Sequence, residues 1–212
     1  SWIVLSGILL KYRGNRSKIE IPENVCVISN GFLENPASVN EITLPAQMEV
    51  ISKGAFQGCT SLRKVVLPEH LTKIGIGAFQ DCTALQTMVL PDSVTELGED
   101  AFLGCTSLQK LVLSKNLKCI PQRAFYQCTS LNEIVIPSGV ERIESQAFVQ
   151  CSSLYALSLP ETVSYVGQNN FNGDTALLSL TVYNPDCHLM TSDYELPKQV
   201  LLYCYQDSSL YW

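Results

Sequence analysis

One order of apolar and polar residues recurs along the chain with a period of 23 positions. Phenylalanine fills one slot of this period six times, at Phe56, Phe79, Phe102, Phe125, Phe148 and Phe171. Cysteine fills a second slot five times in the same register, at Cys59, Cys82, Cys105, Cys128 and Cys151. Self-similarity at a fixed period of this length predicts a repeat protein, in which each repeat forms one coil and packs on the next.

Each repeat contains the same succession of local patterns, as residues 54–76 illustrate. Phe56 and Cys59 are three positions apart, which favours a single helical or 3-10 turn with one buried side. Val65 and Leu67 then alternate with polar or exposed positions, as in a short strand. A coil of this size cannot bury enough apolar surface to be stable alone. The pattern therefore predicts a solenoid with a parallel sheet on one face and short 3-10 or helical turns on the other.

The repeated pattern A-F-x-x-C-x-x-L-x-x-V-x-L-P-x-x-V-x-x-I resembles the BspA-type leucine-rich repeat of bacterial and some protozoan surface proteins. Residues 54–168 match it closely and the flanking repeats match it loosely. Three positions depart from the pattern, since Ser114, Asn170 and Asp174 stand where Pro, Ala and Cys are expected. The pattern is specific for this class of repeat and does not indicate which ligand is bound.

The expected fold is thus a right-handed α/β leucine-rich-repeat solenoid of about seven repeats of 23 residues. We expect residues 1–30 to form an N-terminal cap with a partial first turn. The repeats are expected over residues 31–191, and residues 192–212 are expected to form a C-terminal cap. Caps are needed because the open edge of a parallel sheet would pair with other chains.

Composition excludes two classes of partner. The 212 residues include 14 basic and 20 acidic side chains, and the formal net charge is -6. Binding of nucleic acid usually requires a basic face, so we expect no nucleic-acid partner. No apolar run approaches the ~20 residues that a membrane-spanning helix needs, so we expect no membrane insertion.

Of the nine cysteines, the five that share one register predict buried thiols rather than disulfides or a metal site. Identical positions of stacked coils lie ~4.8 Å apart, whereas a disulfide places its Cβ atoms ~3.8 Å apart. Cys26 and Cys119 occupy slots that hold polar residues in other repeats, so we expect both thiols to be exposed. Cys187 and Cys204 both lie near the C-terminus, where a pairing between them stays open.

The sequence offers little for catalysis, and we expect neither enzymatic activity nor a cofactor or metal. The chain has two histidines, His70 and His188, and contains no HExxH, GxSxG or glycine-rich phosphate-binding motif. Asp186 and Cys187 precede His188, but this segment fits a solvated loop better than a metal site, because nothing brings four ligands together.

The remaining candidate is a surface formed by outward-facing residues of the predicted sheet. We predict a protein-binding site at Lys64, Val66, Thr87, Val89, Lys110, Val112, Glu133 and Val135. Four of these are valines in consecutive repeats, and together they form an outward apolar stripe. Two interpretations stay open: β-branched residues suit any strand, and exposed apolar stripes also mark docking surfaces.

The resemblance implies a non-catalytic adhesion or interaction protein at the bacterial cell surface or secreted from the cell. Its partner would be a protein or glycan of a host or of a neighbouring cell. An intracellular, cytoplasmic scaffold or a structural spacer within a larger protein is the alternative. The low charged fraction of 16% and the exposed positions of Cys26 and Cys119 favour that alternative.

Overall fold

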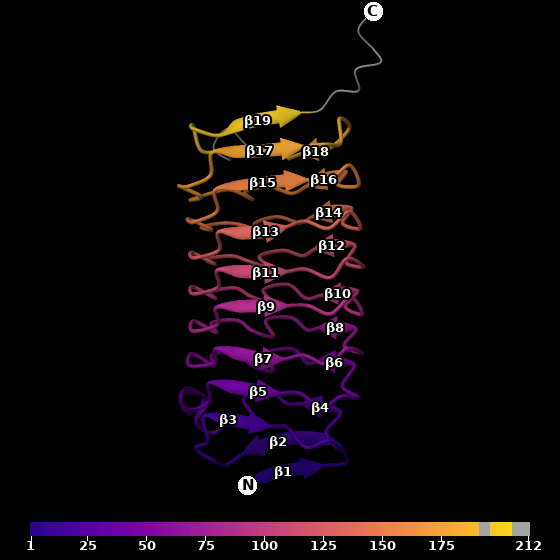
Figure 1. Cartoon of the computed structure of the whole chain (residues 1–212), viewed down its shortest axis with the longest axis vertical. Coiled ribbons are helices and arrows are strands. Elements are labelled where there is room, and N and C mark those ends of the chain that lie inside the picture. The colour runs from indigo at the N-terminus through magenta and orange to yellow at the C-terminus, as the bar shows by residue number, and fades with distance from the viewer. Residues whose placement is uncertain (191–195, 205–212) are drawn as a thin grey trace, which may run out of the picture.

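The computed structural model describes residues 1–190 and 196–204 and forms a β-solenoid of about eight turns (Figure 1). Short strands stack into two columns that run along the whole solenoid. The odd column contains β3 (Lys18–Glu20), β5 (Glu41–Thr43), β7 (Lys64–Val66), β9 (Thr87–Val89), β11 (Lys110–Val112), β13 (Glu133–Val135), β15 (Ala156–Leu159), β17 (Ser179–Val182) and β19 (Leu201–Cys204). Its strands are parallel and form three sheets, β3-β5-β7, β9-β11-β13 and β15-β17-β19.

The even column was not predicted, because its strands are mostly only two residues long. It contains β2 (Ile8–Tyr12), β4 (Val27–Ile28), β6 (Val50–Ile51), β8 (Lys73–Ile74), β10 (Glu96–Leu97), β12 (Cys119–Ile120), β14 (Arg142–Ile143), β16 (Tyr165–Val166) and β18 (His188–Leu189). Its strands from β2 onward are also parallel. Within the sheets β6-β8-β10 and β12-β14-β16-β18, each residue pairs with the one 23 positions later. At the N-terminal end, β1 (Trp2–Leu5) pairs antiparallel with β2 and closes the even column.

The predicted α/β class and helical turns are wrong, since the described residues contain one 3-10 turn, Pro36–Ser38, and no α-helix. The reason lies in the partners of the backbone N–H groups. Alternate donors in the turn bond to the next coil, each at 2.8 Å: Gly54 to Ile76, Phe56 to Ala78 and Gly58 to Gln80. The residues between them close local four-residue turns, such as the one in which the N–H of Ala55 donates to the carbonyl of Ser52. Because every second donor points out of the coil, a helical hydrogen-bond pattern cannot form.

The core contains a stack of phenylalanine rings, as the sequence predicts. The rings of Phe56 and Phe79 have centroids 5.1 Å apart, and those of Phe79 and Phe102 have centroids 5.3 Å apart. Both pairs are close to parallel, with interplanar angles of 14° and 7°. Six consecutive phenylalanines, Phe32 to Phe148, are fully buried. Each ring therefore packs against identical rings from the coils on either side of it.

The three departures from the repeat pattern are also the three buried polar side chains of the described residues, Ser114, Asn170 and Asp174. Asn170 satisfies all its polar groups: its Oδ1 accepts the N–H of Ala147 at 2.8 Å, and its Nδ2 donates to the carbonyls of Glu144 and Gly167. Burial of polar groups is tolerated when they are hydrogen-bonded in this way.

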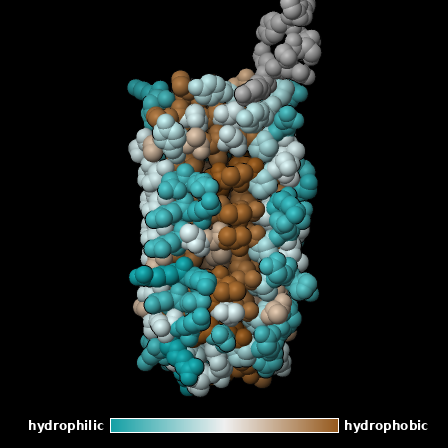
Figure 2. Space-filling view, in the orientation of Figure 1, coloured by the Kyte–Doolittle hydropathy of each residue, from teal (hydrophilic) through white to brown (hydrophobic). Residues whose placement is uncertain are grey.

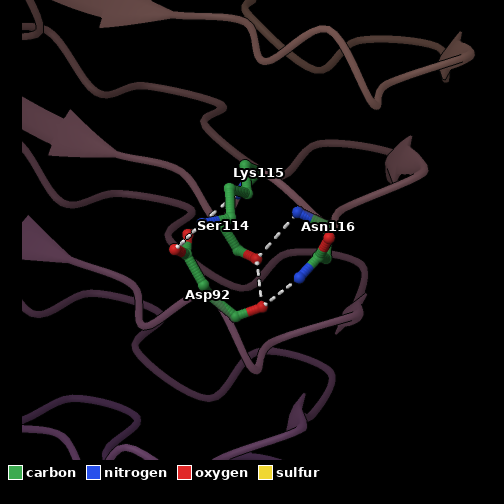
Figure 3. A network of polar contacts seen from close by, with 4 residues as sticks. All are labelled: Asp92, Ser114, Lys115 and Asn116. Atoms are coloured by element: carbon green, nitrogen blue, oxygen red, sulfur yellow. Dashed lines mark hydrogen bonds and ion pairs between the residues drawn. The ribbon is translucent and has the colours of Figure 1, made fainter.

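Ser114 organises a turn where other repeats have proline (Figure 3). Its hydroxyl donates to the carbonyl of Asp92 at 3.2 Å and accepts the N–H of Asn116 at 3.2 Å. The Asn116 side chain donates to the same carbonyl at 2.8 Å, and the ammonium of Lys115 lies 2.5 Å from the Asp92 carboxylate. Side-chain hydrogen bonds therefore hold this turn to the preceding coil.

Candidate functional site

The outer face of the odd column carries an apolar stripe that runs along the solenoid (Figure 2). The second outward position of β7, β9, β11 and β13 is a valine in each case, and we call these four residues the valine stripe. Their exposed fractions are 38% for Val66, 63% for Val89, 41% for Val112 and 70% for Val135. Val89, Val112 and Val135 lie in direct register on the neighbouring strands β9, β11 and β13.

The first outward position of the same strands supplies a polar border. Lys110 and Glu133 form an ion pair, with 2.8 Å between Nζ and Oε1. Lys64 lies 3.2 Å from Oε1 of Glu41, and Thr87 stands uncharged between these two pairs. The eight predicted site residues thus lie together on one face. Because the charges neutralise each other across strands, the stripe is flanked by polar groups without a strong net field.

Two shallow hollows adjoin the stripe at Val135, and sequence reasoning missed both. One, of about 310 Å³, is lined by Val135 together with the small side chains Ala156 and Ser158 and the larger Pro160 and Tyr183. A second hollow of about 260 Å³ lies on the other side of Val135, between β11 and β13. The first arises because Ala156 and Ser158 follow bulkier residues in the two outward positions. This change from larger to smaller outward residues is the signal in the sequence that could have predicted the hollow.

From β8 onward, the outward face of the even column differs in chemistry from the valine stripe of the odd column. Lys73 pairs with Glu96 at 2.6 Å, and the guanidinium of Arg142 lies 4.1 Å from the ring centroid of Tyr165. These outward positions are charged or aromatic rather than aliphatic. The two faces of the solenoid therefore present different chemistry to a partner.

The cysteine column is buried, as predicted, and its thiols are free. Four of its thiols donate to phenylalanine carbonyls at 3.1 to 3.3 Å: Cys82 to Phe56, Cys105 to Phe79, Cys128 to Phe102 and Cys151 to Phe125. Burial raises the pKa of Cys59 to about 12 and raises the pKa of the other four thiols well above the ordinary value. These thiols are protonated donors that link coils, and they are not nucleophiles at neutral pH.

The other cysteines are placed differently from one another. Cys26 is exposed, whereas Cys119 is only half-exposed, so the prediction for Cys119 was wrong in degree. Its Sγ lies 3.9 Å from a carboxylate oxygen of Glu144, and its pKa is raised by burial and then by that charge. Cys187 and Cys204 are both free thiols in this structure.

Within residues 1–190 and 196–204, no group of three or more His, Cys, Asp or Glu side chains is arranged to hold a metal ion. In the same part of the chain, no helix has the length and apolar character needed to cross a bilayer. Most of the predicted C-terminal cap, residues 192–195 and 205–212, lies outside the described residues.

Comparison with known proteins gives a family match over most of the chain. The model described as the BspA type leucine rich repeat region matches in six copies, over residues 11–105 and 72–189. A leucine-rich repeat protein of T. pallidum is 32% identical over 80% of this chain and 82% of that chain, with a TM-score of 0.75. No curated protein matches.

Two further solved structures are similar in fold alone. A leucine-rich repeat protein from Bacteroides ovatus is 19% identical, with a TM-score of 0.56, over 96% of this chain and 65% of that chain. One from Eubacterium ventriosum is 22% identical, with a TM-score of 0.63, over 88% of this chain and 57% of that chain. The repeat pattern, the stacked coils and the family match together lead to one conclusion: the chain belongs to the BspA-type leucine-rich-repeat family.

Proposed function

We propose that this chain is a non-catalytic binding module that docks a protein or glycan partner on the valine stripe. The observation that carries the proposal is the exposure of four aliphatic side chains in consecutive strands, up to 70% at Val135. Contiguous apolar surface bordered by polar groups is typical of interaction sites. The hollow between Val135 and Tyr183 adds a concave position into which a side chain of the partner fits.

The proposed setting is the bacterial cell surface or the secreted fraction, with a partner on a host or neighbouring cell. The BspA-type repeat supports this setting, since such repeats occur in bacterial surface proteins. The second candidate is an intracellular scaffold or structural spacer. The exposed free thiol of Cys26 favours that candidate, because unpaired surface thiols are typical of reducing compartments. Protease treatment of intact source cells separates the two, because only a surface protein is cleaved.

The binding face is tested by capture from a pool of extracellular-matrix and bacterial surface proteins on the immobilised chain. The variant combines Val89→Lys and Val112→Lys, which places two charges in the stripe. Val89 is 63% exposed and Val112 is 41% exposed, so each substitution is expected to change stability by no more than about 0.5 kcal/mol. The matched control combines Thr72→Lys and Thr95→Lys, which add the same charges at exposed positions next to the even column.

We expect the stripe variant to lose a partner that the wild-type chain and the control both retain. Thermal unfolding of all three proteins should be nearly identical. If the stripe variant captures the same partner with the same yield, the valine stripe is not the docking surface.

A further inference from the structure

The first strand of the odd column, β3, has an open edge. Among the described strands it pairs only with β5, on one side. The N-terminal hairpin forms no strand pairing with the other side, because β2 pairs with β1 and with β4 of the even column. In Figure 1, β3 is accordingly the first strand of its column, and the hairpin is drawn directly below it. An unpaired strand edge offers a row of hydrogen-bonding groups to another chain.

The hydrogen bonds of β3 identify which groups face the open edge. The carbonyl of Ser17 accepts an N–H from β5 at 3.0 Å, and the N–H of Ile21 donates to a β5 carbonyl at 3.0 Å. In a parallel strand, the N–H and C=O of one residue point to the same edge and those of the next residue point to the opposite edge. Lys18 and Glu20 therefore direct their backbone groups away from β5, toward the open edge.

A hollow of about 730 Å³ lies along this edge, within the size range of ligand-binding clefts. Lys18, Ile19 and Glu20 of β3 form one wall. The opposite wall includes Trp2 and Tyr12, whose ring centroids are 4.3 Å apart. The hollow thus combines an open strand edge with an aromatic wall, which suits an extended peptide.

Charges on neighbouring strands indicate what such a peptide should contain. Glu41 accepts ion pairs from Lys18 and from Lys64, each at 3.2 Å, and these contacts lower its pKa. Charge therefore alternates from strand to strand along this row. Arg16 also lines the hollow, and no ion pair to it is found among the described residues. An acidic residue opposite Lys18 would continue the alternation of charge between strands and would also lie near the positive charge of Arg16.

We propose that the open edge of β3 binds an extended segment of a partner protein, which adds to the odd column as a parallel strand. The segment carries an acidic residue opposite Lys18, an apolar residue directed inward beside Ile19, and a threonine or basic residue opposite Glu20. Backbone hydrogen bonds supply affinity and the alternate side chains supply specificity in this mode of recognition. The chain itself contains the same order of an acidic residue, an apolar residue and a threonine at Glu41–Thr43, which pairs with β3 from the other side.

The probe is therefore a labelled peptide with the sequence of residues 39–44, Val-Asn-Glu-Ile-Thr-Leu. Fluorescence anisotropy is measured at protein concentrations up to about 1 mM, and saturable binding is expected. In the proposed register, the isoleucine N–H of the probe donates to the Lys18 carbonyl. Methylation of that nitrogen should weaken binding roughly tenfold or more. A probe with lysine in place of glutamate should also bind more weakly.

Two substitutions at Glu20 test the edge from the side of the protein. Glu20→Pro removes an N–H that points away from β5, and proline is tolerated at such a position of an edge strand. This variant should remain folded and lose the probe, whereas Glu20→Ala should bind it nearly as well as wild type. Lys18→Glu should reverse the charge preference, so that the lysine-containing probe binds better than the original.

The proposal is overturned if no saturable binding is found, or if Glu20→Pro binds the probe as the wild-type chain does. Sedimentation supplies a further result: self-association that Glu20→Pro abolishes would identify a second copy as the occupant and overturn the assignment to a partner protein. The stripe variant, with Val89→Lys and Val112→Lys, should bind the probe normally. Failure at this edge is thereby distinguishable from failure of the proposed sheet-face function.

Discussion

Asp174 makes the stability of this protein depend on pH over an unusual range. It stands in the sixth slot of the cysteine column and is fully buried. Its Oδ1 accepts the N–H of Cys151 at 2.8 Å, whereas its Oδ2 has no hydrogen-bond partner. Burial of this carboxyl group raises its pKa from 3.8 to about 8. The side chain is thus a neutral carboxylic acid in the folded protein at neutral pH.

The sign of the effect follows from proton binding. Between pH 3.8 and about 8, folded Asp174 holds a proton that the unfolded chain has released. Stability therefore falls as pH rises through this range, by about 1.4 kcal/mol per pH unit. The full contribution is present below pH 3.8, and no further loss occurs above about pH 8. From pH 5 to pH 7, this residue alone should lower the free energy of unfolding by about 3 kcal/mol.

The assay is urea unfolding at pH 5 and pH 7 of the wild-type chain and of Asp174→Asn. Asparagine keeps an Oδ1 acceptor for the N–H of Cys151 and cannot ionise. Both proteins contain the same other ionisable groups, so the contribution of those groups cancels in the difference. We expect the stability of the wild-type chain relative to Asp174→Asn to fall by about 3 kcal/mol between the two pH values.

A second variant, Asp174→Cys, restores the residue that fills the same slot in five other repeats. It too should lack the pH dependence of the wild type, because a buried thiol remains protonated. If all three proteins change in stability by the same amount between pH 5 and pH 7, Asp174 is already ionised in the folded state and the reasoning fails.

Two further predictions concern the packing of coils on one another. Phe102→Ala removes a ring stacked between Phe79 and Phe125. It should lower the free energy of unfolding, measured in urea, by ~3–5 kcal/mol. A loss under about 1 kcal/mol would show that the phenylalanine column is not the core. Gly98→Ala would place a Cβ against the backbone N of Ile76 in the preceding coil. Because backbone cannot move aside as a flexible side chain does, we expect a loss of about 2 kcal/mol or more, and an unchanged midpoint would contradict the close approach.

The cysteine column shows how far residue type alone could be interpreted. The sequence predicts buried thiols, because five cysteines share a register with buried phenylalanines, and the structure confirms their burial. Their role as donors was not predictable, because the acceptor carbonyl lies 26 positions earlier in the chain. Which carbonyl lies within hydrogen-bonding distance of each thiol is known only once the coils are stacked.

The candidate binding face was also only partly predictable. Alternation of inward and outward residues places the valine stripe, because side chains of a strand point to opposite faces in turn. The hollow beside Val135 depends on Tyr183, which is far away in sequence and close in space. The open edge of β3 depends on where the N-terminal hairpin stacks, which is a property of the assembled solenoid.

The sequence by itself determined the repeat, its period and the identity of the buried columns. Each of these follows from local spacing, since a shift of one residue would expose a whole column. Only the tertiary structure decided the conformation of the turns and the presence of the even column. In both cases the backbone donors bond to carbonyls in neighbouring coils, about 23 residues away. Local propensity favoured a helical turn, but the hydrogen bonds between coils determined the conformation.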